Sequence, residues 1–235
     1  MRIRETHVAD QDVLSAVAHG LQPEVMVCWD SVSVALAGVH DSGIVLGDRT
    51  LVTRLGAIGL MAAQLARLQG ATWVVGSDPI KKRRLLAQAL GVDTTLDPST
   101  VDLGVEVKQH TEKQGVDVSL EASGSYRTLH ATRYGGTAAS IAYYTGSAEG
   151  LHLQGEWHRN QLALLATRDV NDLLRAHPRW TTQRLRQVAV ALLADRRINA
   201  RGVVDPIVPF AASLDAYQEI DHHPERSIKL GIRYD

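Results

Sequence analysis

Short apolar runs alternate with longer segments of helical spacing along most of the 235-residue chain. Leu51 and Val52 form one such run, and the segment after them carries apolar side chains at i, i+3, i+7 and i+10. A second short run begins at Trp73. Buried parallel strands are nearly all apolar and alternate with helices, so this pattern predicts an α/β fold with a doubly wound parallel sheet.

The pattern, with the glycines and prolines that interrupt it, predicts six strands of one sheet, their connecting helices and a terminal strand. The strands are expected at 51–52, 73–75, 92–96, 116–120, 137–143 and 162–166, with an alternating terminal strand through Ile228, Leu230 and Ile232. The helices are expected at 29–42, from the first glycine turn to Gly70, and at 81–90, 105–113, 125–133, 181–194 and about 211–220.

The turn between the first strand and its helix carries Gly56 and Gly59. A strand that enters a helix through glycines leaves backbone N–H groups unpaired at the helix amino terminus, where a pyrophosphate binds well. Gly56 would let the backbone approach the phosphates, and Gly59 would let the helix lie close to the strand. Arg54 stands where the pattern G-x-G-x-x-G has its first glycine, so it either strains the turn or pairs with a phosphate.

An acidic residue, Asp78, follows the second strand, 19 residues after Gly59. A carboxylate there hydrogen-bonds the adenosine ribose of a dinucleotide and repels a 2′-phosphate, which favours NAD over NADP. NADP remains an alternative, because Arg83 and Arg84 could contact the adenosine end of the cofactor. The other alternative at this site is a Rossmann-like domain that binds no dinucleotide.

Three parts are expected in the chain. The central part is a Rossmann fold that binds a dinucleotide, preceded by a short helical extension and followed by a helix–strand appendage on the same domain or on a partner subunit. Their boundaries are 1–28, 29–200 and 201–235.

The charge balance is nearly neutral, with 25 basic and 26 acidic residues, so partners with strong negative charge, nucleic acid or an anionic membrane, are not expected. The single cysteine, Cys28, excludes internal disulfides and a multi-cysteine zinc site. The apolar runs are too short to span a membrane, and the first residues lack the apolar core of a signal peptide. The expected location is therefore cytoplasmic.

Several longer stretches resemble the medium-chain dehydrogenase/reductase superfamily, in its zinc-type alcohol dehydrogenase-like branch. They are GDRTLVTRLGAIGLMAAQLARLQGA, ALGVDTTLDP, GVDVSLEASGSYRTLH, LHLQGEWHRNQLALLATR and VPFAASLDAYQEIDHHPERSIKLGI. The resemblance implies an NAD(P)(H)-binding Rossmann domain and a homodimer in which the sixth strand pairs with its twin. The same resemblance implies the residues of the cofactor site. The pyrophosphate would be lined by Gly56, Ala57, Ile58 and Gly59, and the adenosine ribose by Asp78 and Arg83. The resemblance also implies that the cofactor is bordered by Ser123 and Gly124, and its nicotinamide by Ile141, Ala142 and Tyr143.

One departure from the superfamily bears on chemistry. Its members carry a catalytic domain before the Rossmann domain, with the zinc ligands, the proton relay and most of the substrate pocket, whereas about fifty residues precede the glycine turn here. Cys28 lies roughly where the last zinc ligand would be, without a companion cysteine, so no zinc is expected. The terminal strand needs another partner, either the N-terminal segment or a second subunit.

Tyr143 and His158 are the catalytic candidates, because a phenol or an imidazole can relay a proton while the cofactor carries the hydride. Both, together with Glu156 and Trp157, are expected at the carboxyl edge of the sheet, where Rossmann domains bind their ligands. The alternatives are a packed strand end for Tyr143 and a loop anchor at a subunit contact for His158.

Three functions remain open from the sequence. The first is a zinc-independent, NAD(H)-dependent oxidoreductase that acts on a small alcohol, carbonyl or imine. The second is a non-catalytic NAD(P)-binding module or pseudoenzyme subunit. The third is a Rossmann cleft with a non-redox activity of the cyclase or lyase type.

Overall fold

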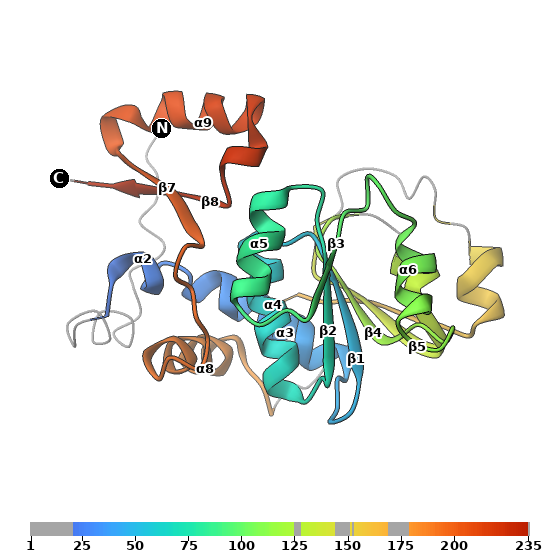
Figure 1. Ribbon diagram of the computed structural model, residues 1–235. Helices are drawn as coiled ribbons and strands as arrows, with labels where there is room; N and C mark the ends of the chain where they lie inside the picture. Colours follow the sequence, from blue (N-terminus) through green and yellow to red (C-terminus); the bar gives the residue numbers. More distant parts are fainter. Residues whose placement is uncertain (1–20, 125–127, 144–150, 152, 169–178, 235) are drawn as a thin grey trace.

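The computed structural model describes residues 21–124, 128–143, 151, 153–168 and 179–234. At its centre is a six-stranded parallel sheet in the order β3-β2-β1-β4-β5-β6 (Figure 1). This is the order of the doubly wound dinucleotide-binding fold, so the predicted fold class is confirmed. The strands are β1 (Arg49–Thr53), β2 (Trp73–Ser77), β3 (Thr94–Leu96), β4 (Val116–Glu121), β5 (Thr132–Ser140) and β6 (Ala163–Ala166).

Helices alternate with these strands, mostly where the pattern predicts them. They are α2 (Pro23–Met26), α3 (Trp29–Ser42), α4 (Ala57–Gln69), α5 (Lys81–Ala89), α6 (Leu103–Gln109), α7 (Thr128–Ala131), α8 (Thr182–Ala194) and α9 (Ser213–His222), with short helical segments η1 (Leu153–Trp157), η2 (Phe210–Ala212) and η3 (Pro224–Arg226). Within the described ranges, none of the helices has both the length and the apolar character needed to cross a membrane.

Helices cover both faces of the sheet. Leu51 packs with Leu103 and Val107 of α6 on one face. Its neighbour Val52 belongs to the larger core cluster, which contains buried residues of α3, α4 and α8. Successive side chains of a strand point to opposite faces, so one apolar run serves both cores. Figure 1 accordingly shows α6 on the opposite side of the sheet from α3 and α4.

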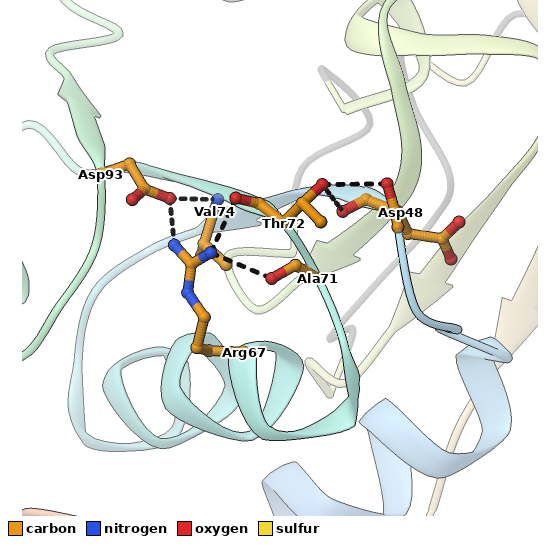
Figure 2. Close-up of polar contacts among 7 residues, drawn as sticks. Asp48, Arg67, Ala71, Thr72, Val74 and Asp93 are labelled. Atoms are coloured by element: carbon orange, nitrogen blue, oxygen red, sulfur yellow. Dashed lines mark hydrogen bonds and ion pairs between the residues drawn. The ribbon is translucent and has the colours of Figure 1, made fainter.

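Polar groups close the amino edge of the sheet, where the strands begin (Figure 2). Arg67, in the last turn of α4, forms an ion pair with Asp93. It also donates hydrogen bonds to the carbonyl oxygens of Ala71 and Thr72, at 3.0 and 2.8 Å. Asp93 accepts a hydrogen bond from the N–H of Val74 at 2.7 Å, which fixes the start of β2. Each of these donors therefore has a partner within the protein.

The fifth strand differs from its prediction. β5 begins at Thr132, where the preceding helix was expected to continue, and it ends at Ser140, before Tyr143. Gly135 and Gly136 lie inside the strand, where its register against β4 shifts, and do not form the predicted turn. Glycine pairs occur both in turns and in strand irregularities, which is why this signal misleads. Residues 125–127 of the predicted helix lie outside the described residues.

A second, two-stranded parallel sheet pairs β7 (Val204–Pro209) with β8 (Lys229–Arg233). β8 is the predicted terminal strand, and β7 is its partner in this sheet. β7 is absent from the prediction because Pro206 and Pro209 argue against a strand, although prolines are tolerated at an edge. We call β7, α9, η3 and β8 the C-terminal unit; it lies beside α5 (Figure 1).

The predicted N-terminal extension is described only from residue 21 onwards. In this part Met26 and Cys28 are buried in the main core cluster, so residues 21–28 pack as part of the Rossmann body.

Candidate functional site

The turn after β1 gives Arg54 the backbone conformation of a glycine. Its φ is 62°, in the left-handed region that side-chain-bearing residues seldom adopt. The N–H of Arg54 donates to the carbonyl oxygen of Ser77 at 2.7 Å, which ties the turn to the end of β2. The side chain of Arg54 is exposed. The turn therefore keeps the shape that the missing glycine would give it, at the cost of backbone strain at this residue.

Gly59 is the point where the turn and α4 come closest. A Cβ atom added to Gly59 would lie 1.9 Å from the carbonyl oxygen of Arg54. No side chain can fit at this distance without moving the turn. This contact agrees with the close helix–strand approach that the sequence predicts for Gly59.

Gly56 precedes the first residue of α4 and faces open space. Within the described residues, a Cβ atom added to Gly56 would meet no other atom within 4 Å. The first turn of α4, including Ala57 and Ile58, contains no acidic residue. The first N–H groups of a helix have no partner inside the helix, and the helix dipole makes this end positive. The residues present therefore fit an anion such as a pyrophosphate.

Asp78 lies at the carboxyl end of β2, next to the glycine turn, and its side chain is fully buried. One carboxylate oxygen accepts from the N–H of Leu55 at 2.8 Å, and the other accepts from the N–H of Ile80 at 2.8 Å. The carboxylate thus joins the turn after β1 to the turn after β2. The contact with Leu55 is one that sequence reasoning missed, since a backbone donor leaves no signal in side-chain patterns.

Two arginines of α5 surround Asp78 with different contacts. The Nη1 atom of Arg83 lies 3.6 Å from the carboxylate. Arg84 donates to the carbonyl oxygens of Asp78 and Pro79, at 2.7 and 2.8 Å, and forms an ion pair with Asp97 at 2.9 Å. Hydrogen bonds from Ser99, with a smaller effect of Arg84, hold the pKa of the Asp97 carboxyl below its ordinary value. The guanidinium of Arg84 is therefore already bound by groups of the protein.

Glu121 shapes the turn after β4, and the sequence does not single it out. Its carboxylate, which is buried, accepts hydrogen bonds from the N–H and the hydroxyl of Ser123. Its carbonyl oxygen accepts from the N–H of Ala142 at 3.1 Å. Ser123, Gly124 and Ala142 thus lie at the carboxyl edge, where β4 is the neighbour of β1. A charged residue at the end of an otherwise apolar strand is the signal that could have identified Glu121.

Tyr143 and His158 lie at opposite edges of the sheet. Tyr143 follows the carboxyl end of β5 and is 84% exposed. His158 precedes β6, which begins at Ala163 and runs parallel to β5, so His158 lies on the amino side. Glu156 lies there too, because its carboxylate is 3.2 Å from the ring of His130 in α7, the helix that leads into β5. The prediction that His158 and Glu156 share the carboxyl edge with Tyr143 is wrong, because the chain must return to the amino edge before a parallel strand begins.

Cys28 lies between α2 and α3 with no exposed surface. Burial raises the pKa of its thiol to about 11, and the positive charge of Lys229 opposes this shift only in part. Without a metal, a thiol with this pKa does not ionise at neutral pH. Nor do the described residues contain a group of three or more His, Cys, Asp or Glu that could hold a metal ion.

The sequence of this chain is similar to the sequences of known dehydrogenases. The family model of zinc-binding dehydrogenases matches residues 57–175. D-guloside 3-dehydrogenase of Escherichia coli is 38% identical over 213 residues, which are 88% of this chain and 61% of that enzyme. An alcohol dehydrogenase of Cupriavidus necator is 35% identical over 137 residues, 56% of this chain and 37% of that protein. The chain thus spans about three fifths of the length of the first of these relatives.

Solved structures share the fold. An alcohol dehydrogenase from Thermus sp. ATN1 superposes with a TM-score of 0.75 at 23% identity, over 92% of this chain and 61% of that one. A zinc-binding dehydrogenase from Sinorhizobium meliloti, solved with bound NADP, superposes with a TM-score of 0.74 at 23% identity, over 91% of this chain and 60% of that one.

Proposed function

Because this chain belongs to the zinc-binding dehydrogenase family, we propose that it forms the NAD(H)-binding part of an oxidoreductase. The cofactor would supply the hydride chemistry, between its nicotinamide and a small alcohol, carbonyl or imine. The observation that carries this proposal is the convergence of three features at one edge of the sheet: the glycine turn, the open amino terminus of α4 and the carboxylate of Asp78.

The glycine turn would hold the pyrophosphate of the cofactor. Gly56, Ala57, Ile58 and Gly59 would face it with backbone N–H groups, because the start of α4 offers donors and the positive end of the dipole. The guanidinium of Arg54 would stay exposed at the mouth of this turn and pair with a phosphate oxygen.

The rest of the cofactor would follow the carboxyl edge. Asp78 would hydrogen-bond the adenosine ribose, with Arg83 beside it, and its negative charge supports NAD over NADP. The contacts of Arg84 with the Asp78 carbonyl oxygen and the Asp97 carboxylate also support NAD over NADP, since they leave its guanidinium little freedom to bind a 2′-phosphate. Ser123, Gly124 and Ala142, which Glu121 places at the switch between β1 and β4, would border the nicotinamide half.

The substrate would be a polyhydroxylated small molecule with a secondary alcohol or the corresponding ketone. The similarity to D-guloside 3-dehydrogenase supports this class, since it extends over 88% of the chain. Tyr143 is the proposed proton relay on this side, because it is exposed at the carboxyl edge and a phenol can exchange a proton with a hydroxyl. The part of the reaction that falls on this chain would be independent of zinc; in support, the described residues contain no group of three or more His, Cys, Asp or Glu side chains that could hold a metal ion.

A homodimer is also proposed, with β6 of one subunit beside β6 of the other. β6 is at the edge of the sheet, and most of its residues are exposed, including the apolar Leu164 at 40%. An exposed apolar edge strand is a template for strand pairing. Leu164→Lys should shift the mass measured by light scattering from dimer to monomer, and an unchanged mass would contradict this interface.

A second candidate function is a non-catalytic NAD(H)-binding module. The placement of His158 favours it, since the chain does not bring its two proton-relay candidates to one edge. This candidate shares the cofactor site with the first and differs only in lacking turnover.

Titration of the purified chain with NADH and NADPH, followed by nicotinamide fluorescence, tests the proposal. Saturable binding with preference for NADH is expected, and the absence of binding would reject both candidates. Turnover should then be measured over a panel of sugar-like alcohols and their ketones. Turnover that falls strongly in Tyr143→Phe supports the oxidoreductase, whereas binding without turnover supports the non-catalytic module.

A further inference from the structure

Two neighbouring residues of α5 attach the C-terminal unit to the Rossmann body. The Nζ atom of Lys82 donates to the carbonyl oxygen of Arg226 at 2.6 Å and forms an ion pair with Asp205, also at 2.6 Å. The Nη2 atom of Arg83 donates to the carbonyl oxygen of Ser227 at 3.3 Å. Both contacts start from the first turn of α5, which begins at Lys81, shortly after Asp78 and the end of β2. The C-terminal unit is therefore held beside the proposed ribose site.

Asp78 has no exposed side-chain surface, although the proposed function needs it to meet ribose hydroxyls. Two of the groups against its carboxylate are backbone N–H groups in the turns after β1 and β2. The third is the guanidinium of Arg83, the one side chain that forms an ion pair with Asp78 in the described part of the molecule. A backbone turn is fixed by its neighbours, whereas an arginine side chain can change rotamer, so Arg83 is the group that can uncover the carboxylate.

The contacts of Arg83 are incomplete in this position. Its side chain is 11% exposed, and its buried Nε atom has no hydrogen-bond partner in the structure as described. The Nη1 contact to Asp78, at 3.6 Å, is longer than a hydrogen bond. The guanidinium thus makes one long hydrogen bond, to Ser227, and leaves its Nε donor without a partner. A competing ligand can displace a group held in this way.

We propose that Arg83 is a latch between the adenosine-ribose site and the C-terminal unit. With the latch closed, Arg83 covers Asp78 and holds Ser227. When the ribose of a dinucleotide reaches Asp78, Arg83 leaves the carboxylate and its contact with Ser227 is lost. This inference rests on the proposed function, and it assigns to Arg83 a positioning role in place of the direct ribose contact that the sequence implies.

The latch has a reciprocal consequence. Any ligand that displaces Arg83 loosens the C-terminal unit, and any change that frees Arg83 from Ser227 favours the ligand by the same factor, since the coupling of two equilibria is mutual. Lys82 offers a matched control, because it holds the same unit through Asp205 and Arg226 and forms no ion pair with Asp78.

The test compares wild type, Arg83→Gln and Lys82→Gln, each shown to be folded by circular dichroism. Dissociation constants for NADH, and for AMP as a probe that carries only the adenosine ribose and one phosphate, are measured together with hydrogen–deuterium exchange of residues 224–233. Arg83→Gln should bind NADH and AMP more tightly, by about fivefold. It should also show fast exchange of 224–233 without a ligand and little further change with NADH. Lys82→Gln should speed the exchange while NADH affinity stays within about twofold of wild type.

Two results would overturn the latch. One is weaker NADH binding by Arg83→Gln, as expected for a direct ribose ligand; the other is exchange of 224–233 in wild type that NADH leaves unchanged. Failure of the proposed function is distinguishable from these, because then neither wild type nor Arg83→Gln binds NADH or AMP. Binding by Arg83→Gln alone would support the latch in its strongest form, as a contact that keeps the site closed.

Discussion

The two edges of the parallel sheet treat their polar groups in opposite ways. At the amino edge, Arg67 and Asp93 bind each other and the backbone around the start of β2, so donors and acceptors close on one another (Figure 2). At the carboxyl edge, glycine replaces the side chains that could close the start of α4, and no atom of the described part of the chain lies within 4 Å of a Cβ added to Gly56. Stability and ligand binding therefore depend on different ends of the same strands, so mutations at the two edges should change them separately.

The largest effect is expected from Gly59→Ala. A Cβ atom 1.9 Å from the carbonyl oxygen of Arg54 must displace the turn, and forced overpacking of this kind costs about 3 kcal/mol. We expect the free energy of unfolding, measured in urea, to fall by about that amount and NADH binding to be lost. A stable Gly59→Ala protein that binds NADH normally would show that the turn is not the rigid feature described here.

A smaller effect is expected at the amino edge from Asp93→Ala. This change leaves the N–H of Val74 without its acceptor and Arg67 without its ion pair, which costs about 1–2 kcal/mol after allowance for the exposure of both side chains. The midpoint of urea unfolding should fall while the dissociation constant for NADH stays the same. An altered NADH affinity would mean that the two edges are coupled.

Substitution of Arg54 should change stability and NADH binding in opposite directions. Arg54→Gly removes the left-handed strain of about 1–2 kcal/mol and adds the backbone entropy of glycine, for a net gain of about 0.5–1 kcal/mol. It also removes the exposed positive charge, so NADH binding should weaken severalfold and depend less on salt. Arg54→Ala is the control, since it removes the charge and keeps the strain. Unchanged NADH affinity in both variants would show that Arg54 contacts no phosphate.

The smallest effect is the pH dependence of stability that comes from His40, in the last turn of α3. Burial, with smaller contributions from Arg179 and Arg184 that Asp41 opposes, lowers the pKa of His40 below its ordinary value of 6.5. As pH falls through the interval below 6.5, the unfolded chain takes up a proton that the folded chain resists, so the free energy of unfolding decreases. Urea unfolding at about pH 7.5 and about pH 5.5 should show a smaller loss in His40→Gln than in wild type. Equal losses would exclude His40 as a source of the pH dependence.

The sequence predicts the fold because it depends on patterns that are local. Apolar runs, the helical stripe of α4 and the closing glycines place most elements within a few residues, and α6 begins earlier than predicted because Asp102 caps it through the N–H of Val105 at 2.9 Å. The glycine turn and the start of α4 in the candidate site are predicted for the same reason, because they too depend on local sequence. The sequence does not reveal to which edge of the sheet a loop returns, and for this reason His158 was expected at the wrong edge. Nor does it reveal that Arg83 reaches Ser227 in the C-terminal unit, 144 residues away in the chain.

The most direct test of the open carboxyl edge is the dissociation constant of NADH in wild type and in Gly56→Ala. Alanine fits the backbone at this position, where φ is −73°, and its Cβ meets no atom of the described residues within 4 Å. The free energy of unfolding should therefore stay within about 0.5 kcal/mol of wild type. The added methyl group would instead occupy the space proposed for the pyrophosphate, and NADH should bind at least about tenfold more weakly. Equal NADH affinity in the two proteins, or no NADH binding by wild type, would contradict the account.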